Sequence, residues 1–175
     1  MILCIDTATK EAGIGLLEAQ RCVEFLALPT DRVSEKILET IDLILRRAQL
    51  EPRELKHIFV ITGPGSFTSL RVGLTVANQF AHQLGIHITG IRSDEFFAAR
   101  TDEKDFLYLQ SMNQVEVYAR GYGSATLRTD IDESFLNPAN LPKKGVKYFD
   151  DTDWKWVVSG RQEYREKVWQ MLKGK

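Results

Sequence analysis

Residues 57–85 read HIFVITGPGSFTSLRVGLTVANQFAHQLG, and this stretch decides the fold. The apolar run His57–Thr62 predicts a buried strand, and Gly63-Pro64-Gly65 ends that strand at a sharp turn. Five apolar residues then recur at steps of three and four, which predicts a helix that ends at Gly85. They are Leu70, Leu74, Ala77, Ala81 and Leu84. A strand that leads directly into a helix indicates a sheet with helices on its faces.

The residues before this stretch predict three strands and a helix. Ile2–Ile5, Ala12–Leu17 and Cys22–Leu28 are short apolar runs joined by tight turns, as in a β-meander. From Arg32 to Gln49 the apolar period changes to that of an amphipathic helix. Its apolar stripe comprises Ile37, Leu38, Ile41, Ile44, Leu45 and Ala48.

The residues after this stretch add a strand at Ile86–Ile91 and a short helix at Ser93–Arg100. The order βββαβαβα predicts an α/β lobe over residues 1–100. Residues 101–175 predict a second, shortened lobe. Its expected elements are strands at Phe106–Gln110, Val115–Gly121, Ala125–Leu127 and Lys155–Val158, a loop at Asn137–Lys144 and a last helix at Gln162–Leu172.

Composition excludes several classes of protein. The chain has 175 residues, of which 43% are hydrophobic, and a formal net charge of −1, so neither intrinsic disorder nor a basic nucleic-acid-binding domain is indicated. Cys4 and Cys22 are too few for a disulfide framework and predict packing roles in a reducing, cytoplasmic compartment. No apolar stretch approaches the ~18 residues of a membrane helix, and the first residues predict a strand rather than a signal peptide.

Two loops are candidates for binding a phosphate or a nucleotide. Gly63, Gly65 and Ser66 form a glycine-rich turn before a helix N-terminus, where backbone N–H groups can hold an anion. Asp6 and Thr7 follow the first strand, where a carboxylate can orient a ligand. The alternatives are a purely structural turn at the glycines and an Asx turn at Asp6.

Several catalytic motifs are absent from the sequence. The glycine-rich turn lacks the Gly-Lys-Ser/Thr ending of a Walker loop, and its serine lacks the second glycine of a hydrolase elbow. The three histidines have no metal-ligand spacing, so no metal and no cofactor are expected.

Two motifs resemble the TsaB (YeaZ) family. Residues 2–9, ILCIDTAT, are similar to that family's opening I-L-x-I-D-T-S/A-T, and residues 63–74, GPGSFTSLRVGL, to its signature G-P-G-S-F-T-G-L-R-I-G. With Ser93-Asp94-Glu95 and the order of elements, the resemblance covers about the first 100 residues. The chain departs from the family pattern at Val33, at Ser69 and at Gln110-Ser111-Met112, and its second lobe is shorter.

The resemblance implies an actin-like ATPase (ASKHA) fold and a non-catalytic role. Members pair with a TsaD subunit, or with themselves, through helices of the first lobe. With a TsaE ATPase, that assembly transfers a threonylcarbamoyl group to adenosine 37 of tRNA, so contact of this chain with tRNA is expected to be indirect or weak. The candidate interface residues are Leu38, Ile41, Leu45, Val72, Gly73, Val76 and Phe80.

Two other functions remain open on the sequence. The first is a compact ASKHA ATPase or small-molecule kinase that uses the Asp6 and Gly63 loops. The second is a self-associating protein without a TsaD partner. The locally basic tail allows solvated lysines and arginines or a direct contact with tRNA. Its basic residues are Lys155, Arg161, Arg165, Lys167, Lys173 and Lys175.

Overall fold

The chain divides into two units, Met1–Ser93 and Asp94–Lys175, each with its own internal contacts. The structure, a computed structural model, describes residues 1–9, 12–19, 21–99, 106–111, 117–122, 134–136 and 155–159.

The first unit is built on a five-stranded mixed sheet. Its strands are β1 (Ile2–Asp6), β2 (Gly13–Glu18), β3 (Arg21–Ala27), β4 (His57–Ile61) and β5 (His87–Ile91). They lie in the order β3-β2-β1-β4-β5. The meander β1-β2-β3 is antiparallel, whereas β4 runs parallel to both β1 and β5. The sheet is therefore of the mixed α/β kind that the sequence predicts.

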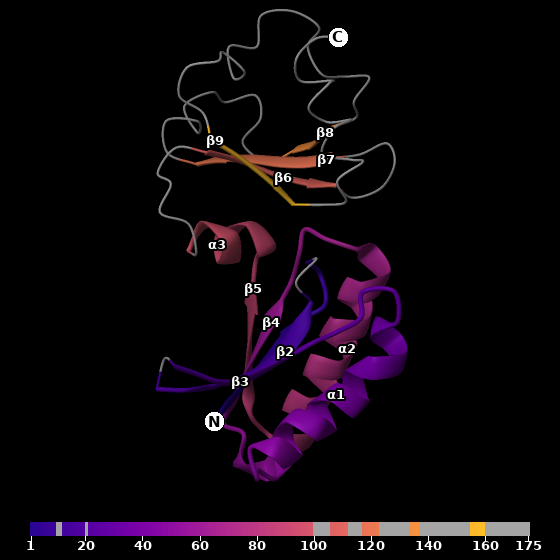
Figure 1. Ribbon diagram of the computed structural model, residues 1–175, viewed down its shortest axis with the longest axis vertical. Helices are drawn as coiled ribbons and strands as arrows, with labels where there is room; N and C mark the ends of the chain where they lie inside the picture. The colour runs from indigo at the N-terminus through magenta and orange to yellow at the C-terminus, as the bar shows by residue number, and fades with distance from the viewer. Residues whose placement is uncertain are drawn as a thin grey trace, which may run out of the picture. The chain divides into compact units, whose positions relative to one another are not determined.

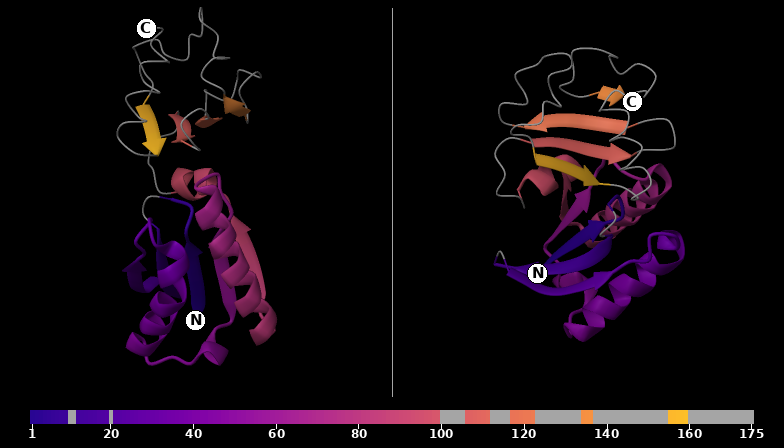
Figure 2. Two further views of the ribbon diagram at one scale, coloured as in Figure 1. Left: turned by 90° about the vertical axis from the view of Figure 1, so that its right-hand side faces the viewer. Right: turned by 45° about the horizontal axis from the view of Figure 1, so that its top comes forward.

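Two helices cover one face of this sheet (Figure 1; Figure 2, left). The helix α1 (Val33–Arg47) packs on β2 and β3, and α2 (Phe67–Leu84) packs on β1, β4 and β5. A short 3-10 turn, η1 (Pro52–Glu54), precedes β4. The core lies between the helices and the sheet, and its buried side chains include Leu3, Ile5, Ile14, Leu16, Ile37, Ile44 and Ile58.

Most of these elements agree with the sequence prediction. The helix α2 has the predicted bounds and ends at Gly85, which adopts the left-handed conformation (φ +65°) that glycine tolerates. The helix predicted over Arg32–Gln49 spans only Val33–Arg47 in the structure, and its C-cap is Ala48. Ser66 occupies the N-cap position of α2, but its hydroxyl makes no capping hydrogen bond; its Oγ lies 3.1 Å from Ser69 Oγ instead.

The second unit contains a four-stranded sheet. After the short helix α3 (Ser93–Ala98), the strands β6 (Phe106–Ser111), β7 (Val117–Tyr122), β8 (Ser134–Leu136) and β9 (Lys155–Ser159) lie in the order β8-β7-β6-β9. The sequence did not predict the three-residue β8. The predicted strand Ala125–Leu127, the loop Asn137–Lys144 and the helix Gln162–Leu172 lie outside the described residues.

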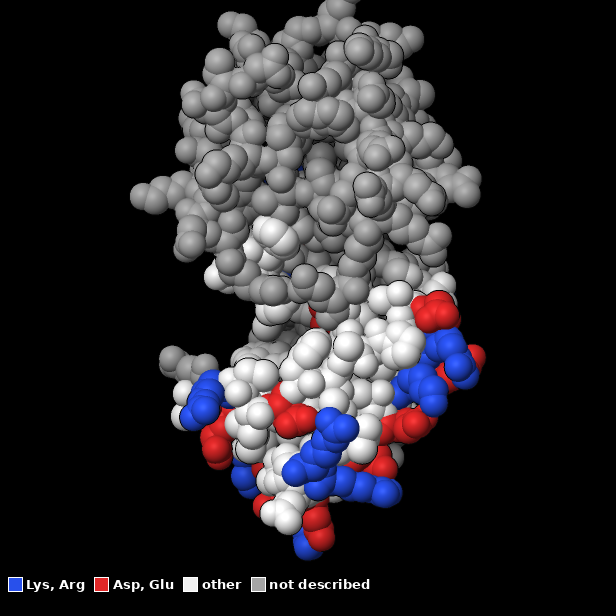
Figure 3. Space-filling model, viewed as in Figure 1, with Lys and Arg blue, Asp and Glu red and all other residues white. Residues whose placement is uncertain are grey.

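Charged side chains of both signs are interspersed over the first unit on the face shown in Figure 3. Along α1, Arg32 pairs with Glu35, Lys36 with Glu39, and Arg46 with Asp42. These ion pairs are exposed and contribute little to stability. Within the part of the chain that is described, no helix combines the length and apolar character needed to cross a bilayer.

Candidate functional site

The loop that follows β1 is closed by its own side chain. Asp6 Oδ1 accepts hydrogen bonds from the backbone N–H groups of Ala8 (2.9 Å) and Thr9 (3.1 Å), and Asp6 Oδ2 accepts one from Thr9 Oγ1 (2.5 Å). This is the Asx turn that the sequence offered as the alternative to a ligand site, and that alternative is confirmed. The Asp6 carboxylate at the end of β1 therefore has its hydrogen-bond partners within its own turn.

The two candidate loops meet at Ala8. The Ser66 N–H donates to the Ala8 carbonyl (3.4 Å), and a Cβ atom added at Gly65 would overlap that same carbonyl. Gly63 has a φ of +96°, and the Gly63–Pro64 peptide bond is cis. Ala8 therefore lies directly against the glycine-rich turn, which gives Gly65 a packing role beside the β1–β2 loop.

The residue that follows β1 packs against the small residue in the middle of α2. A Cβ atom at Gly73 would overlap Thr7 Oγ1 and lie 3.0 Å from Thr7 Cγ2. Thr7 is buried, and its Oγ1 has no hydrogen-bond partner. The prediction placed Gly73 at a contact between helices. The structure corrects this, because Gly73 lets α2 approach the end of β1.

The predicted interface residues separate into two groups. Ile41 and Leu45 are 1% and 4% exposed and belong to the chain's own core, so their assignment to an interface was wrong. Leu38 is 57% exposed, while Val72, Val76 and Phe80 are partly buried against the core. An apolar stripe has the same period whether it faces a sheet or a partner. The sequence therefore could not separate the centre of the stripe from its flank.

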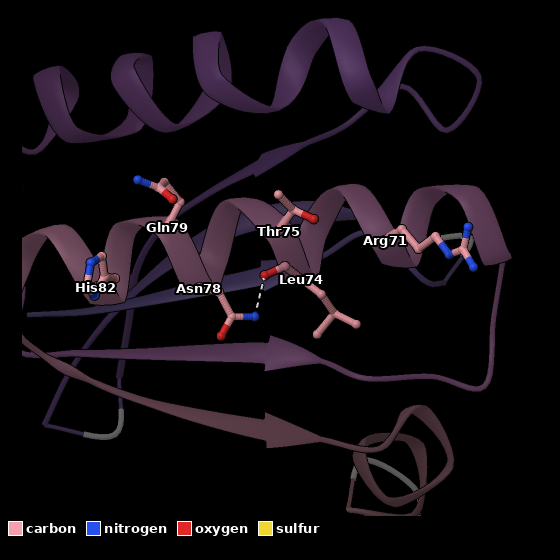
Figure 4. A pocket seen from close by; sticks show the side chains of 6 residues that line it. All are labelled: Arg71, Leu74, Thr75, Asn78, Gln79 and His82. Atoms are coloured by element: carbon pink, nitrogen blue, oxygen red, sulfur yellow. Dashed lines mark hydrogen bonds between the residues drawn. The ribbon is translucent and has the colours of Figure 1, made fainter.

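The exposed side of α2 carries a shallow groove of about 630 Å³ that no sequence motif predicted. Its side chains extend along the helix, with the Asn78 amide donating to the Leu74 carbonyl at 2.7 Å (Figure 4). We call it the α2 groove; it is lined by Arg71, Leu74, Thr75, Asn78, Gln79 and His82. Beside it, the Arg71 guanidinium stacks on the Phe67 ring, 3.8 Å from its centroid, and Phe67 is 64% exposed.

One signal for this groove was present in the sequence. Residues 67–84 contain a single charged side chain, Arg71, although 27% of the whole chain is charged. The exposed side of a helix in solvent is normally charged. The low charge of α2 is what distinguishes it from α1, with its row of ion pairs.

The second unit contains a polar cluster at the start of α3. The Asp94 side chain is fully buried and accepts hydrogen bonds from Arg120 Nη1 (2.7 Å) and the Tyr118 hydroxyl (3.2 Å). Burial raises the pKa of the neighbouring Tyr122 above its ordinary value. No sequence pattern predicted this cluster, because its members are 24 and 26 residues apart.

The described residues contain no group of three or more His, Cys, Asp and Glu side chains that could hold a metal ion. Cys4 and Cys22 are both free thiols, the first half-buried and the second exposed. Burial raises the pKa of the Cys4 thiol to about 11. The exposure of Cys22 differs from its predicted packing role.

Comparison with known proteins gives matches from the biosynthesis of tRNA threonylcarbamoyladenosine. A family model described as "TsaD: tRNA N6-adenosine threonylcarbamoyltransferase" matches residues 29–149, more than half of the chain. The tRNA threonylcarbamoyladenosine biosynthesis protein TsaB of Bacillus subtilis is 33% identical over 99 residues, which are 56% of this chain and 43% of that protein. An uncharacterized protein of Mycobacterium tuberculosis is 30% identical over 124 residues, 69% of this chain and 58% of its own. The chain thus spans about half the length of these relatives.

Two solved structures from Pseudomonas aeruginosa share the fold. YeaZ superposes with a TM-score of 0.62 at 18% identity, covering 81% of this chain and 68% of YeaZ. A second chain, described as an uncharacterized protein with similarity to peptidase YEAZ, superposes with a TM-score of 0.64 at 18% identity, covering 89% and 74%. At this identity the likeness concerns the fold alone.

Proposed function

Because the chain belongs to the TsaB (YeaZ) family, we propose that it acts in the biosynthesis of tRNA threonylcarbamoyladenosine as a non-catalytic scaffold. In this proposal the first unit has the actin-like (ASKHA) fold and docks a TsaD-like subunit, and a TsaE-like ATPase joins the assembly. A role on tRNA places the work of the protein in the cytoplasm. The name of the B. subtilis relative supports the pathway.

The observation that supports docking is the exposed side of the two helices. We define the docking face as Leu38, Phe67 and the residues of the α2 groove. Phe67 is 64% exposed and contacts Arg71 of the α2 groove, and Leu38 is 57% exposed on α1, the helix that packs beside α2. Exposed large apolar side chains favour a protein contact. Thr75, Asn78 and Gln79 then supply uncharged hydrogen-bonding groups, which lose less on desolvation than charges do.

The charge of the docking face indicates what the partner presents. Arg71 is the only charged side chain of α2, and no acidic residue lies in that helix. A partner that places a carboxylate opposite the guanidinium of Arg71 would gain a charge-assisted pair. The Arg71 guanidinium also stacks on the Phe67 ring, so one partner surface would contact both side chains.

The loops support a non-catalytic role. Asp6, the residue that a nucleotide-binding reading needs, already accepts three hydrogen bonds from its own turn. Ala8 packs against Gly65 of the glycine-rich turn and accepts a hydrogen bond from the Ser66 N–H. Opening this arrangement for a ligand would require breaking both contacts.

The first experiment measures complex formation with the TsaD-like subunit of the same organism. Light scattering on a sizing column should give a peak at the mass of a complex that contains both proteins. Leu38→Lys should abolish or strongly reduce that peak, because it places a charge in an apolar contact. Val23→Lys is the matched control, since Val23 is a similarly exposed apolar residue (45%) outside the docking face.

Two results would contradict the proposal. A complex unaffected by Leu38→Lys would show that the partner docks elsewhere. Thermal stabilisation by Mg-ATP would favour the ATPase reading instead; a ligand at 100 times its Kd adds about 2.7 kcal/mol of stability. No shift with Mg-ATP, together with a complex sensitive to Leu38→Lys, is the expected outcome.

A further inference from the structure

Two of the three histidines of the chain lie side by side on the five-stranded sheet. His57 begins β4 and His87 begins β5, and the two residues are register partners on these parallel strands (Figure 1). Their ring centroids are 6.4 Å apart, and the ring planes are tilted by 35°. We call them the histidine pair. Its members are 30 residues apart in the sequence, so no motif along the chain indicates it.

The histidine pair faces away from the two helices. Successive side chains of a strand point to opposite faces of the sheet, and Ile58 and Val60 of β4 belong to the core between the sheet and the helices. His57 therefore points to the other face of the sheet, where it is half-buried, while His87 is exposed. An ion in solution can reach this face without any opening of the core.

A hydroxyl group is in place to orient the first histidine. Thr89 Oγ1 lies 2.8 Å from His57 Nε2, and Thr89 stands two residues after His87, on the same face of β5. When Nε2–H donates to this hydroxyl, the lone pair of the His57 imidazole is on Nδ1. Histidines that bind metals commonly donate their second ring N–H to an oxygen acceptor, which fixes the tautomer and the orientation of the ring.

The neighbours of the histidine pair on the two strands suit a cation. Phe59 meets the His57 ring edge-on, with the centroids 5.0 Å apart, and an apolar neighbour limits the access of water to a metal site. β4 reads HIFVI and β5 reads HITGI, so neither strand contains a lysine or an arginine that would repel a cation.

We propose that His57 and His87 together bind one divalent transition-metal ion, and that Thr89 is a positioning residue which orients His57. Two imidazole nitrogens at ~2.0–2.1 Å from one ion place their ring centroids about 5 Å apart, so the rings have to approach by about 1 Å. Rotation of the exposed His87 side chain supplies this movement, since exposed side chains change rotamer readily. Water completes the coordination of the ion.

The two nitrogen ligands select the class of ion. Imidazole suits Zn²⁺, Cu²⁺ and Ni²⁺, whereas Mg²⁺ and Ca²⁺ require oxygen ligands. A bound ion would tie β5, an end strand of the sheet, to its neighbour β4. Because a ligand that binds only the folded state stabilises it, the ion should raise the unfolding temperature. This site goes beyond the proposed function and does not depend on it, since the docking face lies on the helices.

The test is calorimetric titration of the full-length, untagged chain with Ni²⁺. We expect one ion per chain, and His87→Ala and His57→Gln should each weaken binding by about tenfold or more. The two changes together should weaken it little further, because either one alone leaves a single imidazole. His82→Ala is the matched control, since His82 is an exposed histidine on α2, and it should leave the affinity for Ni²⁺ unchanged.

Thr89→Val tests the positioning role. Valine keeps the β-branched shape of threonine and removes only the hydroxyl. The variant should bind Ni²⁺ about tenfold more weakly, while the unfolding temperature of the metal-free chain should change little because Thr89 is exposed. An unchanged affinity for Ni²⁺ in this variant would contradict the role given to Thr89.

Three results would overturn the metal site. One is a chain that binds no Ni²⁺, and another is binding that His87→Ala leaves unaffected. The third is binding that is lost in Cys22→Ser, which would place the ion at that exposed thiol. Because His87 is exposed, His87→Ala keeps the test decisive even where His57→Gln fails to fold. Ni²⁺ should also raise the unfolding temperature of the unchanged chain and not that of His87→Ala, and equal shifts in both would contradict the site.

Discussion

Gly73 shows how one missing side chain sets the distance between a helix and a strand. A Cβ atom there would overlap Thr7 Oγ1, and Thr7 lies directly after β1 in the fully buried part of the first unit. The helix can lie this close to the sheet only because residue 73 has no side chain. The position therefore belongs to the core, although it stands within the sequence signature of the family.

Gly73→Ala should destabilise the chain, against the usual trend in helices. Alanine is favoured over glycine in a helix by about 1 kcal/mol, but overpacking costs ~1–3 kcal/mol, so we expect a net loss of up to roughly 2 kcal/mol in a urea titration. Thr75→Ala on the exposed side of α2 is the control and should change little. Adding Thr7→Ala to Gly73→Ala should recover part of the loss; no recovery would place the strain elsewhere.

Among the elements, α2 was fully predictable and α1 only in part. The steps of three and four from Leu70 to Leu84, bounded by Ser66 and Gly85, fix both ends of α2. The stripe of α1 is equally regular, yet Ile41 and Leu45 face the sheet while Leu38 faces outward. Periodicity gives the apolar side of a helix, but only the packed structure gives its flanks. The three-residue β8 is too short for any periodic pattern.

The candidate site was predictable where local chemistry governs it. The Asx turn at Asp6 follows from its own side chain and the next three residues. The contact of Gly65 with Ala8 joins residues far apart in sequence, and so does the pairing of Asp94 with Arg120. Such contacts depend on how whole elements pack, which a single sequence does not specify.

The pair Asp94–Arg120 connects α3 to β7 within the second unit. Arg120→Met would remove the guanidinium that faces a fully buried carboxylate. Breaking a buried ion pair from one side costs about 3–5 kcal/mol, whereas replacing both partners costs much less. We therefore expect Arg120→Met to lower the urea midpoint strongly, and Asp94→Leu combined with Arg120→Met to restore much of it. Equal losses in the single and double variants would show that the pair contributes nothing specific.

For the whole molecule, the docking face predicts an assembly that one substitution can take apart. If each copy docks one TsaD-like subunit through this face, Leu38→Lys should leave the two proteins sedimenting separately, because it places a charge in an apolar contact. Val23→Lys should leave the mass of the complex unchanged, since Val23 lies outside the docking face. Sedimentation of the mixtures checks this, and a complex that survives Leu38→Lys would contradict it.

The position of β1 in the centre of the sheet has a consequence for synthesis on the ribosome. β1 pairs with β2 on one side and with β4 on the other, and β4 begins only at His57. At ~5–20 residues per second, the ~30 residues between the end of β3 and the start of β4 take about 1.5–6 s to be made. During that interval β1, which becomes the central strand of the sheet, has β2 on one side and no partner on the other. The emergence of His57–Ile61 is thus the moment at which β1 can gain its second neighbour, and a chaperone that shields unpaired strands would act before it.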